Sequence, residues 1–284
     1  MLTSNKVSRL IPEKYCKVFM LSTYPSNRHV YLWRNRSLCL GPSSSLLPRL
    51  YGAVALHIGI YQPFQLTVDG GEPINCRCAV VPANTRHQLD FSGGIHGKLF
   101  IERDSSDYLY FLQRFPHQER ALSFFEDREA IDCFRWIFEE CPEKEAIATR
   151  LDLLLRYNGQ LQLTFDPRVQ KVIELICAEP NRNFSQEHLA AVVNLSVSRF
   201  LHLFKEHVDV PYRRFRMWKR LLNTMRNIYE TDNMTQAAVE AGFSDAAHFS
   251  HCFRDTYGVN PALVFHKVSH FEVASLYSEQ DRLP

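Results

Sequence analysis

One helical unit occurs twice in this chain, and this duplication constrains its fold more than any other feature of the sequence. The first copy, residues 185–211, reads SQEHLAAVVNLSVSRFLHLFKEHVDVP, and the second, residues 234–261, reads MTQAAVEAGFSDAAHFSHCFRDTYGVNP. The copies align at an offset of 48 residues up to a shared turn and at 49 residues after it. Each copy predicts a short helix, a tight turn, a cap and a second helix, which together form a helix-turn-helix.

Residues at matched positions of the two copies suit the same structural roles. Small residues let the two helices of a unit cross closely, apolar residues fill the turn, and serines can cap the second helix. Phenylalanines four residues apart then place one buried stripe on that helix. The matched pairs are Ala190 and Ala238, Leu195 and Phe243, Ser196 and Ser244, Phe200 and Phe249, and Phe204 and Phe253.

The second helix of each unit, predicted at Ser196–Val208 and Asp245–Tyr257, has a small, polar and basic outward face. Side chains of these kinds suit a helix placed in the major groove of DNA, where they meet base edges and phosphates. Lys205 and Arg220 are expected to contact only the DNA backbone. The candidate DNA-binding residues are Ser196, Ser198, Arg199, His202, Lys205, Arg220, Ala247, His248, Ser250, His251 and Arg254.

A long helix, PYRRFRMWKRLLNTMRNIYE, is predicted between the two units. It is rich in arginine and lysine, and the sequence has no acidic residue from Val210 to Tyr229. Its apolar positions can pack the two units into one body, while its cations offer a local positive surface for phosphates. The basic residues are Arg213, Arg214, Arg216, Lys219, Arg220 and Arg226.

Two simpler interpretations of the outward faces compete with DNA binding. A single amphipathic helix with a polar face is usually just solvated surface, but two matched copies argue against that reading. His248 and His251 lie three residues apart and could bind zinc. Their only near partner of ligand type, Cys252, falls on the buried side of the helix, which disfavours a metal.

The first half of the chain predicts strands followed by helices. Residues 31–103 consist of short apolar runs separated by turn signals, which is typical of a small barrel or sandwich, with a hairpin end at Thr67–Gly71. Residues 107–159 have helical periodicity and end at Asn158-Gly159. Asp166-Pro167 is a helix start signal, so the boundary between the halves is expected near residues 164–166.

Bulk composition fits a globular chain of two domains. The 284 residues are 45% hydrophobic and 23% charged, and the formal net charge of +2 gives no whole-molecule attraction to nucleic acid. Neither a signal peptide nor a membrane-spanning run is evident, and eight scattered cysteines do not suggest a disulfide framework. Cys76 and Cys78 are expected to pack as small apolar residues. These features predict a cytoplasmic protein.

The second half resembles the DNA-binding domain of AraC/XylS-family transcription regulators over residues 166–264. The stretch AAVEAGFSDAAHFSHCFRDTYGVNP matches the most recognisable part of that family, and LAAVVNLSVSRFLHLFKEHV resembles its first unit. The resemblance implies two helix-turn-helix units joined by a long helix, and it favours activation over repression. One departure is Asp209, where the family commonly has glycine, so this helix end is expected to be slightly strained.

The strands of the first half resemble, more weakly, the cupin-like sensor barrels that precede such domains. PANTRH, residues 82–87, is similar to a cupin motif with Asn84 in place of glycine. An enzyme-type metal centre needs three or four convergent ligands, and His57, His87 and His96 are interpreted as structural. The barrel interior could still hold a small organic ligand.

The sequence therefore predicts an α+β protein in four parts: a cupin-like β-barrel over 1–106, helices for dimerisation over 107–163, an AraC-type domain over 164–264 and a tail over 265–284. The expected function is sequence-specific transcription regulation, without a catalytic role, a metal or a cofactor. Promoter DNA, RNA polymerase and a second copy of the chain are the expected partners, and a membrane is not. The alternatives are a metal-dependent cupin enzyme with a DNA-binding appendage, and a barrel that dimerises and senses nothing.

Overall fold

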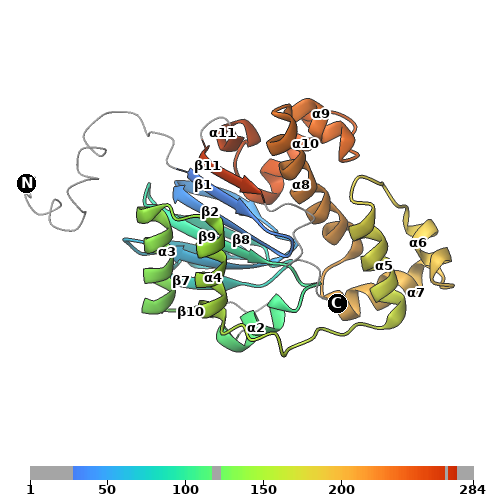
Figure 1. Cartoon of the computed structure of the whole chain (residues 1–284), viewed down its shortest axis with the longest axis horizontal. Coiled ribbons are helices and arrows are strands. Elements are labelled where there is room, and N and C mark those ends of the chain that lie inside the picture. Colours follow the sequence, from blue (N-terminus) through green and yellow to red (C-terminus); the bar gives the residue numbers. More distant parts are fainter. Residues whose placement is uncertain (1–27, 117–122, 266–267, 274–284) are drawn as a thin grey trace, which may run out of the picture.

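A computed structural model describes residues 28–116, 123–265 and 268–273, with strands in the first half and helices in the second (Figure 1). The α+β class expected from the sequence is confirmed. The strands are β1 (Arg28–Leu32), β2 (Arg36–Pro42), β3 (Ser45–Arg49), β4 (Val54–Gly59), β5 (Phe64–Val68), β6 (Ile74–Cys76), β7 (Cys78–Val81), β8 (His87–Asp90), β9 (Ile95–Ile101), β10 (Ser123–Phe125) and β11 (Val268–Val273).

These strands form two sheets. One has seven strands in the order β10-β7-β4-β9-β2-β1-β11, and the other has four in the order β3-β8-β5-β6. The predicted hairpin end is confirmed, because β5 and β6 pair antiparallel across a turn in which Asp69 and Gly70 both have positive φ.

The cupin-like expectation needs one correction, because no ladder among the described strands closes the sheets into a barrel. The sheets end in the strands β6 and β10 of only three residues each, and such short edges cannot continue the pairing from one sheet to the other. The first half is therefore a two-sheet structure with its core between the layers.

Three helices, α2 (Asp107–Arg114), α3 (Arg128–Glu140) and α4 (Lys144–Leu155), cover the seven-stranded sheet on one face (Figure 1). Their apolar side chains share one core with that sheet, in which Phe111, Phe134 and Leu151 are fully buried. The sequence left open whether these apolar faces pack on the strands or on another subunit. They pack on the strands.

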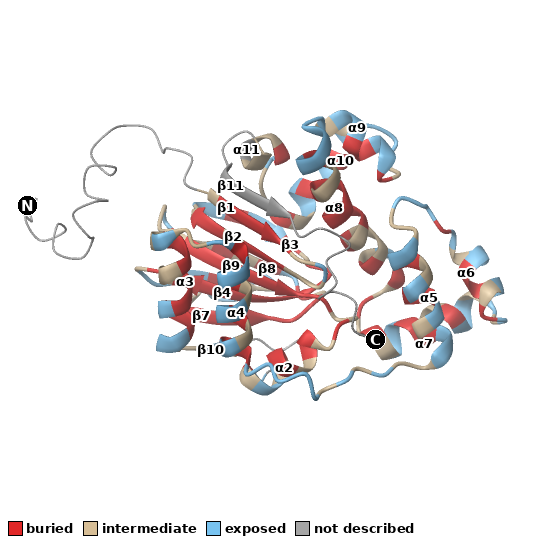
Figure 2. Ribbon diagram, viewed as in Figure 1, coloured by how far each residue is buried: buried red, intermediate tan, exposed pale blue. Residues whose placement is uncertain are grey.

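The second half is helical, and its longest helix, α8, runs between the two helix-turn-helix units (Figure 1). The burial colours of Figure 2 show the inward faces of these helices as buried and the outer faces of α6, α7 and α9 as largely exposed. The helices are α5 (Pro167–Ala178), α6 (Gln186–Val192), α7 (Val197–Val208), α8 (Tyr212–Thr231), α9 (Met234–Glu240), α10 (Ala246–Tyr257) and α11 (Pro261–Phe265).

The two halves are not independent bodies. One core contains Val30, Ala55 and Phe100 from the strands together with Trp218 and Phe249 from the helices. No sequence signal was found after Phe265, yet β11 lies beyond that residue and pairs in parallel with β1 at the edge of the larger sheet. The segment Val268–Val273 thus packs on the first half.

Candidate nucleic-acid interface

The two helix-turn-helix units have the same backbone turn. Asn194 and Gly242 occupy matched positions and both have the left-handed conformation, at φ 55° and 84°. The amide of the next residue then donates back to the matched alanine, Leu195 to Ala190 over 2.9 Å and Phe243 to Ala238 over 3.0 Å. Sequence and backbone therefore agree that one unit was duplicated.

A side-chain oxygen caps each of the four helices and accepts from the amide three residues later. Ser196 caps α7 and Asp245 caps α10. The second helix of each unit, called the recognition helix below, therefore starts where the sequence predicted. Asp245 rather than Ser244 is the cap of α10, and the Ser244 hydroxyl donates to the Asp245 carboxylate over 3.0 Å. The caps of α6 and α9 are Ser185 and Asn233.

The recognition helices α7 and α10 bury the predicted aromatic stripes and expose the opposite faces. Phe200, Phe204, Phe249 and Phe253 are at most 2% exposed. The predicted outward residues are exposed, apart from the half-buried Ser250 and the buried Arg220: Ser196, Ser198, Arg199, His202, Lys205, Ala247, His248, His251 and Arg254. The geometry thus gives each unit one solvent-facing helix with polar and cationic side chains.

Two acidic residues on these faces were missed by the sequence analysis. His251 Nδ1 lies 3.2 Å from Asp255 Oδ2, and His202 Nδ1 lies 3.6 Å from Glu206 Oε2. The i,i+4 spacing of both pairs is the signal that could have found them. Each carboxylate can orient the imidazole next to it and leave the other ring nitrogen facing solvent.

Arg220 was expected on the surface that contacts DNA, but the structure buries it. Its side chain is 7% exposed, its Nη2 donates to Asn183 Oδ1 over 2.8 Å, and its guanidinium stacks on Phe243. A guanidinium so enclosed has no surface left for a phosphate, so the structure gives Arg220 a packing role.

Most other cations of α8 also bind within the protein rather than forming the expected positive surface. Arg216 donates to the Phe184 carbonyl, and Arg226 donates to the Trp33 carbonyl of the first half. Lys219 forms ion pairs with Glu102 and Asp104, also of the first half. Arg213 is the fully exposed cation of this helix.

Two arginines of the first half hold the last carbonyls of the recognition helices. Arg103 Nε donates to the Val208 carbonyl over 3.2 Å, and Arg49 Nη1 donates to the Tyr257 carbonyl over 2.8 Å. Cations at a helix C-terminus satisfy free carbonyls and favour the helix dipole. Both recognition helices are therefore tied to the strands at the same end.

The structure brings His57, His87 and His96 together inside the first half. His57 Nδ1 lies 3.1 Å from His96 Nε2, and the rings of His57 and His87 have centroids 6.0 Å apart. Burial lowers the pKa of His87 to about 3 and holds those of the other two well below their usual value. Among the described residues, no three His, Cys, Asp or Glu side chains have an arrangement that could hold a metal ion.

A small cavity of about 70 Å³, the strand pocket, lies between the strands and the second half. Its wall includes Lys98 from β9 and Tyr257 from α10. Lys98 has no carboxylate partner among the described residues, and its ammonium lies 5.2 Å from the Phe100 ring centroid. Burial lowers the pKa of Lys98 to about 8. An unpaired buried cation in a mostly apolar pocket suits an anionic ligand with an apolar body.

No helix in the described part of the chain is long and apolar enough to cross a membrane. Cys76 and Cys78 are free and mostly buried, and burial raises their pKa values to about 12 and about 11. Both thiols therefore stay protonated at neutral pH, as apolar packing requires.

Residues 189–267 match a protein family described as a helix-turn-helix domain. The HTH-type transcriptional regulator GbdR of Pseudomonas aeruginosa is 26% identical over 99 residues, which is 34% of this chain and 27% of GbdR. A regulator of the same type from Haemophilus influenzae is 26% identical over 106 residues, 37% of this chain and 36% of that protein. This chain thus aligns with only about a third or less of the curated relatives it matches.

Solved structures show the same fold over most of the chain. ToxT from Vibrio cholerae O395 superposes with a TM-score of 0.56 and 12% identity, covering 84% of this chain and all of that one. A structure of unsaturated fatty acid-bound wild-type ToxT from strain SCE256 has a TM-score of 0.56 and 11% identity, covering 84% of this chain and 97% of ToxT. The likeness extends across both halves.

Proposed function

We propose that this protein, in which residues 189–267 match a helix-turn-helix domain family, is a sequence-specific, DNA-binding transcription regulator of the AraC type. The observation that carries the proposal is the pair of matched recognition helices, each with a side-chain cap, a preceding left-handed turn and an exposed polar face. The resemblance to AraC/XylS regulators favours activation. A catalytic role has no support from the geometry.

The two recognition helices would enter successive major grooves of one face of the duplex, about 34 Å apart. The 20 residues of α8 span about 30 Å, which suits that separation. Ser198, Arg199 and His202 would contact bases or nearby phosphates from the first helix. His248, His251 and Arg254 would do so from the second, while Lys205 would reach only the backbone.

Substitution on the second recognition helix tests the proposal. A promoter fragment found by genome-wide mapping of bound DNA serves as the probe in fluorescence anisotropy. His251→Ala and Arg254→Ala should each weaken binding by about 1–3 kcal/mol and relax sequence preference. Arg135→Ala, which removes a half-buried arginine on α3, is the matched control. Unchanged promoter affinity in both variants would refute the role of α10.

We propose that two copies of the chain form a dimer through α4. Leu153 is 60% exposed and Tyr157 is 41% exposed at the end of this helix, where they offer apolar surface to a second copy. Leu153→Glu should therefore shift a dimer to monomer in sedimentation experiments. We also propose that the domain boundaries lie at residues 106, 163 and 264. The protein would contact RNA polymerase and act in the cytoplasm.

The strand pocket suggests control by an amphipathic carboxylate. Lys98 would pair with the carboxylate, and the apolar wall would hold its chain. The fatty acid-bound form of ToxT supports this class of ligand. The cavity of about 70 Å³ limits the ligand to a short chain, so butyrate should raise the melting temperature of the full chain. Lys98→Met should abolish the rise, whereas equal shifts in both proteins would exclude the site.

The competing cupin enzyme requires a resident transition metal. Elemental analysis of the purified protein separates the two functions, because a stoichiometric metal would favour the enzyme.

A further inference from the structure

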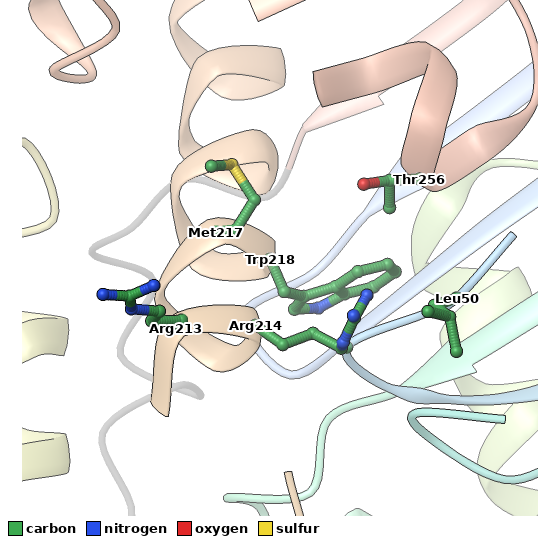
Figure 3. A pocket seen from close by; sticks show the side chains of 7 residues that line it. Leu50, Arg213, Arg214, Met217, Trp218 and Thr256 are labelled. Atoms are coloured by element: carbon green, nitrogen blue, oxygen red, sulfur yellow. The ribbon is translucent and has the colours of Figure 1, made fainter. Parts of the chain in front are cut away.

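A second cleft lies where the two halves meet, and it shares no lining residue with the strand pocket. It has a volume of about 220 Å³ and is bounded by α8, by the last turn of α10 and by the segment before β4 (Figure 3). Gly52 brings that segment close to α8, because a Cβ there would lie 2.5 Å from Trp218 Cβ. The cleft is thus built from both halves.

Unused hydrogen-bond donors line this interface cleft. Arg214 Nε and Trp218 Nε1 are buried and have no acceptor in the described structure. Trp218 is only 2% exposed, so its indole N–H is shielded from bulk solvent. Burial alone lowers the pKa of Arg214, and no carboxylate contributes to its shift. Figure 3 shows the Arg214 guanidinium beside the Trp218 indole and facing Leu50.

The remaining wall is apolar or neutral. Leu50 and Met217 provide apolar surface, and Thr256 adds a hydroxyl group. Arg213 lies at the exposed side and adds a second positive charge. No acidic residue lines the cleft. Buried donors without acceptors are costly, and the cost is removed when an anion accepts from them.

We propose that the interface cleft binds a small organic carboxylate with an aromatic or short aliphatic body. A carboxylate matches the planar guanidinium fork, and the Trp218 indole and Met217 suit the apolar body. The volume corresponds to roughly seven water molecules of liquid, which fits a single-ring acid rather than a long chain.

Binding at this position would be coupled to DNA reading, a consequence that rests on the proposed function. Arg214 lies in the first turn of α8 and Thr256 in the last turn of α10, while Leu50 lies between β3 and β4 in the first half. A ligand that contacts all three fixes the second recognition helix relative to the first half. A DNA phosphate is the competing occupant, and the half-buried setting of Arg214 beneath the 50–52 segment disfavours it.

Nuclear magnetic resonance of the full chain tests the site directly, with benzoate as the probe. The chain has three tryptophans, and Trp218→Phe identifies the indole N–H signal of Trp218. Saturating benzoate should shift this signal more than the other two. Arg214→Gln should lower the affinity for benzoate at least tenfold. Lys98→Met, a substitution in the strand pocket, should leave this affinity unchanged.

Three results with benzoate alone would overturn the proposal. They are an unmoved Trp218 signal, equal affinity in the Arg214→Gln protein, and loss of the response in the Lys98→Met protein. Inorganic phosphate binding as tightly as benzoate would also overturn it, because it would show a general anion site.

Promoter anisotropy separates this proposal from the regulator function. Without benzoate, Arg214→Gln should bind the promoter as wild type does. Weaker binding with a salt dependence reduced by about one charge would make Arg214 a phosphate contact and overturn the cleft. Benzoate binding by a protein that ignores all promoter DNA would support the cleft and refute the regulator.

Discussion

Asp209 follows the last residue of the first recognition helix in the left-handed conformation, at φ 60°, where the second unit has Gly258 at φ 74°. A side chain costs more than glycine in this conformation. The carboxylate has a compensating partner, because Asp209 Oδ2 lies 3.2 Å from Arg103 Nη2 in the first half. The departure from glycine at this residue therefore marks a contact between the halves.

We expect the effect of Asp209→Gly to depend on Arg103. In the wild-type chain the substitution relieves the backbone but removes an ion pair, so the free energy of unfolding should change by less than about 0.5 kcal/mol. In an Arg103→Met background only the relief remains, and stability should rise by about 1 kcal/mol. Urea denaturation of the four proteins measures both effects. Equal effects in both backgrounds would show that the two residues are not coupled.

The buried histidines predict a loss of stability in acid. His57, His87 and His96 stay neutral in the folded chain, but the unfolded chain protonates them below about pH 6.5. The unfolded state therefore gains protons as the pH falls, and stability, complete above about pH 6.5, declines toward pH 3 by up to about 1.4 kcal/mol per pH unit for each histidine.

Urea unfolding across this pH range measures the slope. The slope measures the number of protons taken up on unfolding, and His87→Leu should lower this number by about one. His188→Gln, a substitution on the exposed side of α6, should leave the slope unchanged. A slope unaffected by His87→Leu would place the proton uptake elsewhere.

At the scale of elements, α10 ends against a buried arginine. A Cβ on Gly258 would lie 2.2 Å from Arg49 Nη1, and Arg49 is itself 2% exposed. Gly258→Ala should therefore cost about 2–3 kcal/mol through backbone strain and displacement of Arg49. Gly159 has nearly the same φ, 73°, with open space around it, so Gly159→Ala should cost about 1 kcal/mol from strain alone. Equal costs in thermal unfolding would exclude a role for Arg49.

The helix-turn-helix units were predictable because their signals are local. Caps lie three residues from the amides they satisfy, and turns need a left-handed residue such as Asn194 or Gly242. The partners of the cations on α8 were not predictable from local signals. Lys219 and Glu102 are 117 residues apart, and a helical pattern does not say which charged face meets another part of the chain. The pairing of β11 with β1 was hidden by an even larger separation in sequence, since Arg28 pairs with Val268.

At the scale of the whole molecule, the two halves behave as one body because their contacts are both apolar and charged. Trp218 packs on Phe100, with ring centroids 4.9 Å apart. Close to this core, Lys219 Nζ lies 2.7 Å from Asp104 Oδ2 and also pairs with Glu102. Burial lowers the pKa of Lys219, but the charges of Asp104 and Glu102 more than offset it, so the pKa is raised overall.

Lys219→Met should destabilise the full chain by about 3–5 kcal/mol, because it leaves two buried carboxylates without a cation. The triple variant Lys219→Met, Glu102→Gln, Asp104→Asn removes the charges as well and should regain most of that loss. The free energy of unfolding in urea distinguishes these outcomes, and promoter anisotropy in the same proteins reports on the recognition helices. Wild-type stability in both the single and the triple variant would mean that the charges do not join the halves, and that the apolar contact of Trp218 with Phe100 is sufficient.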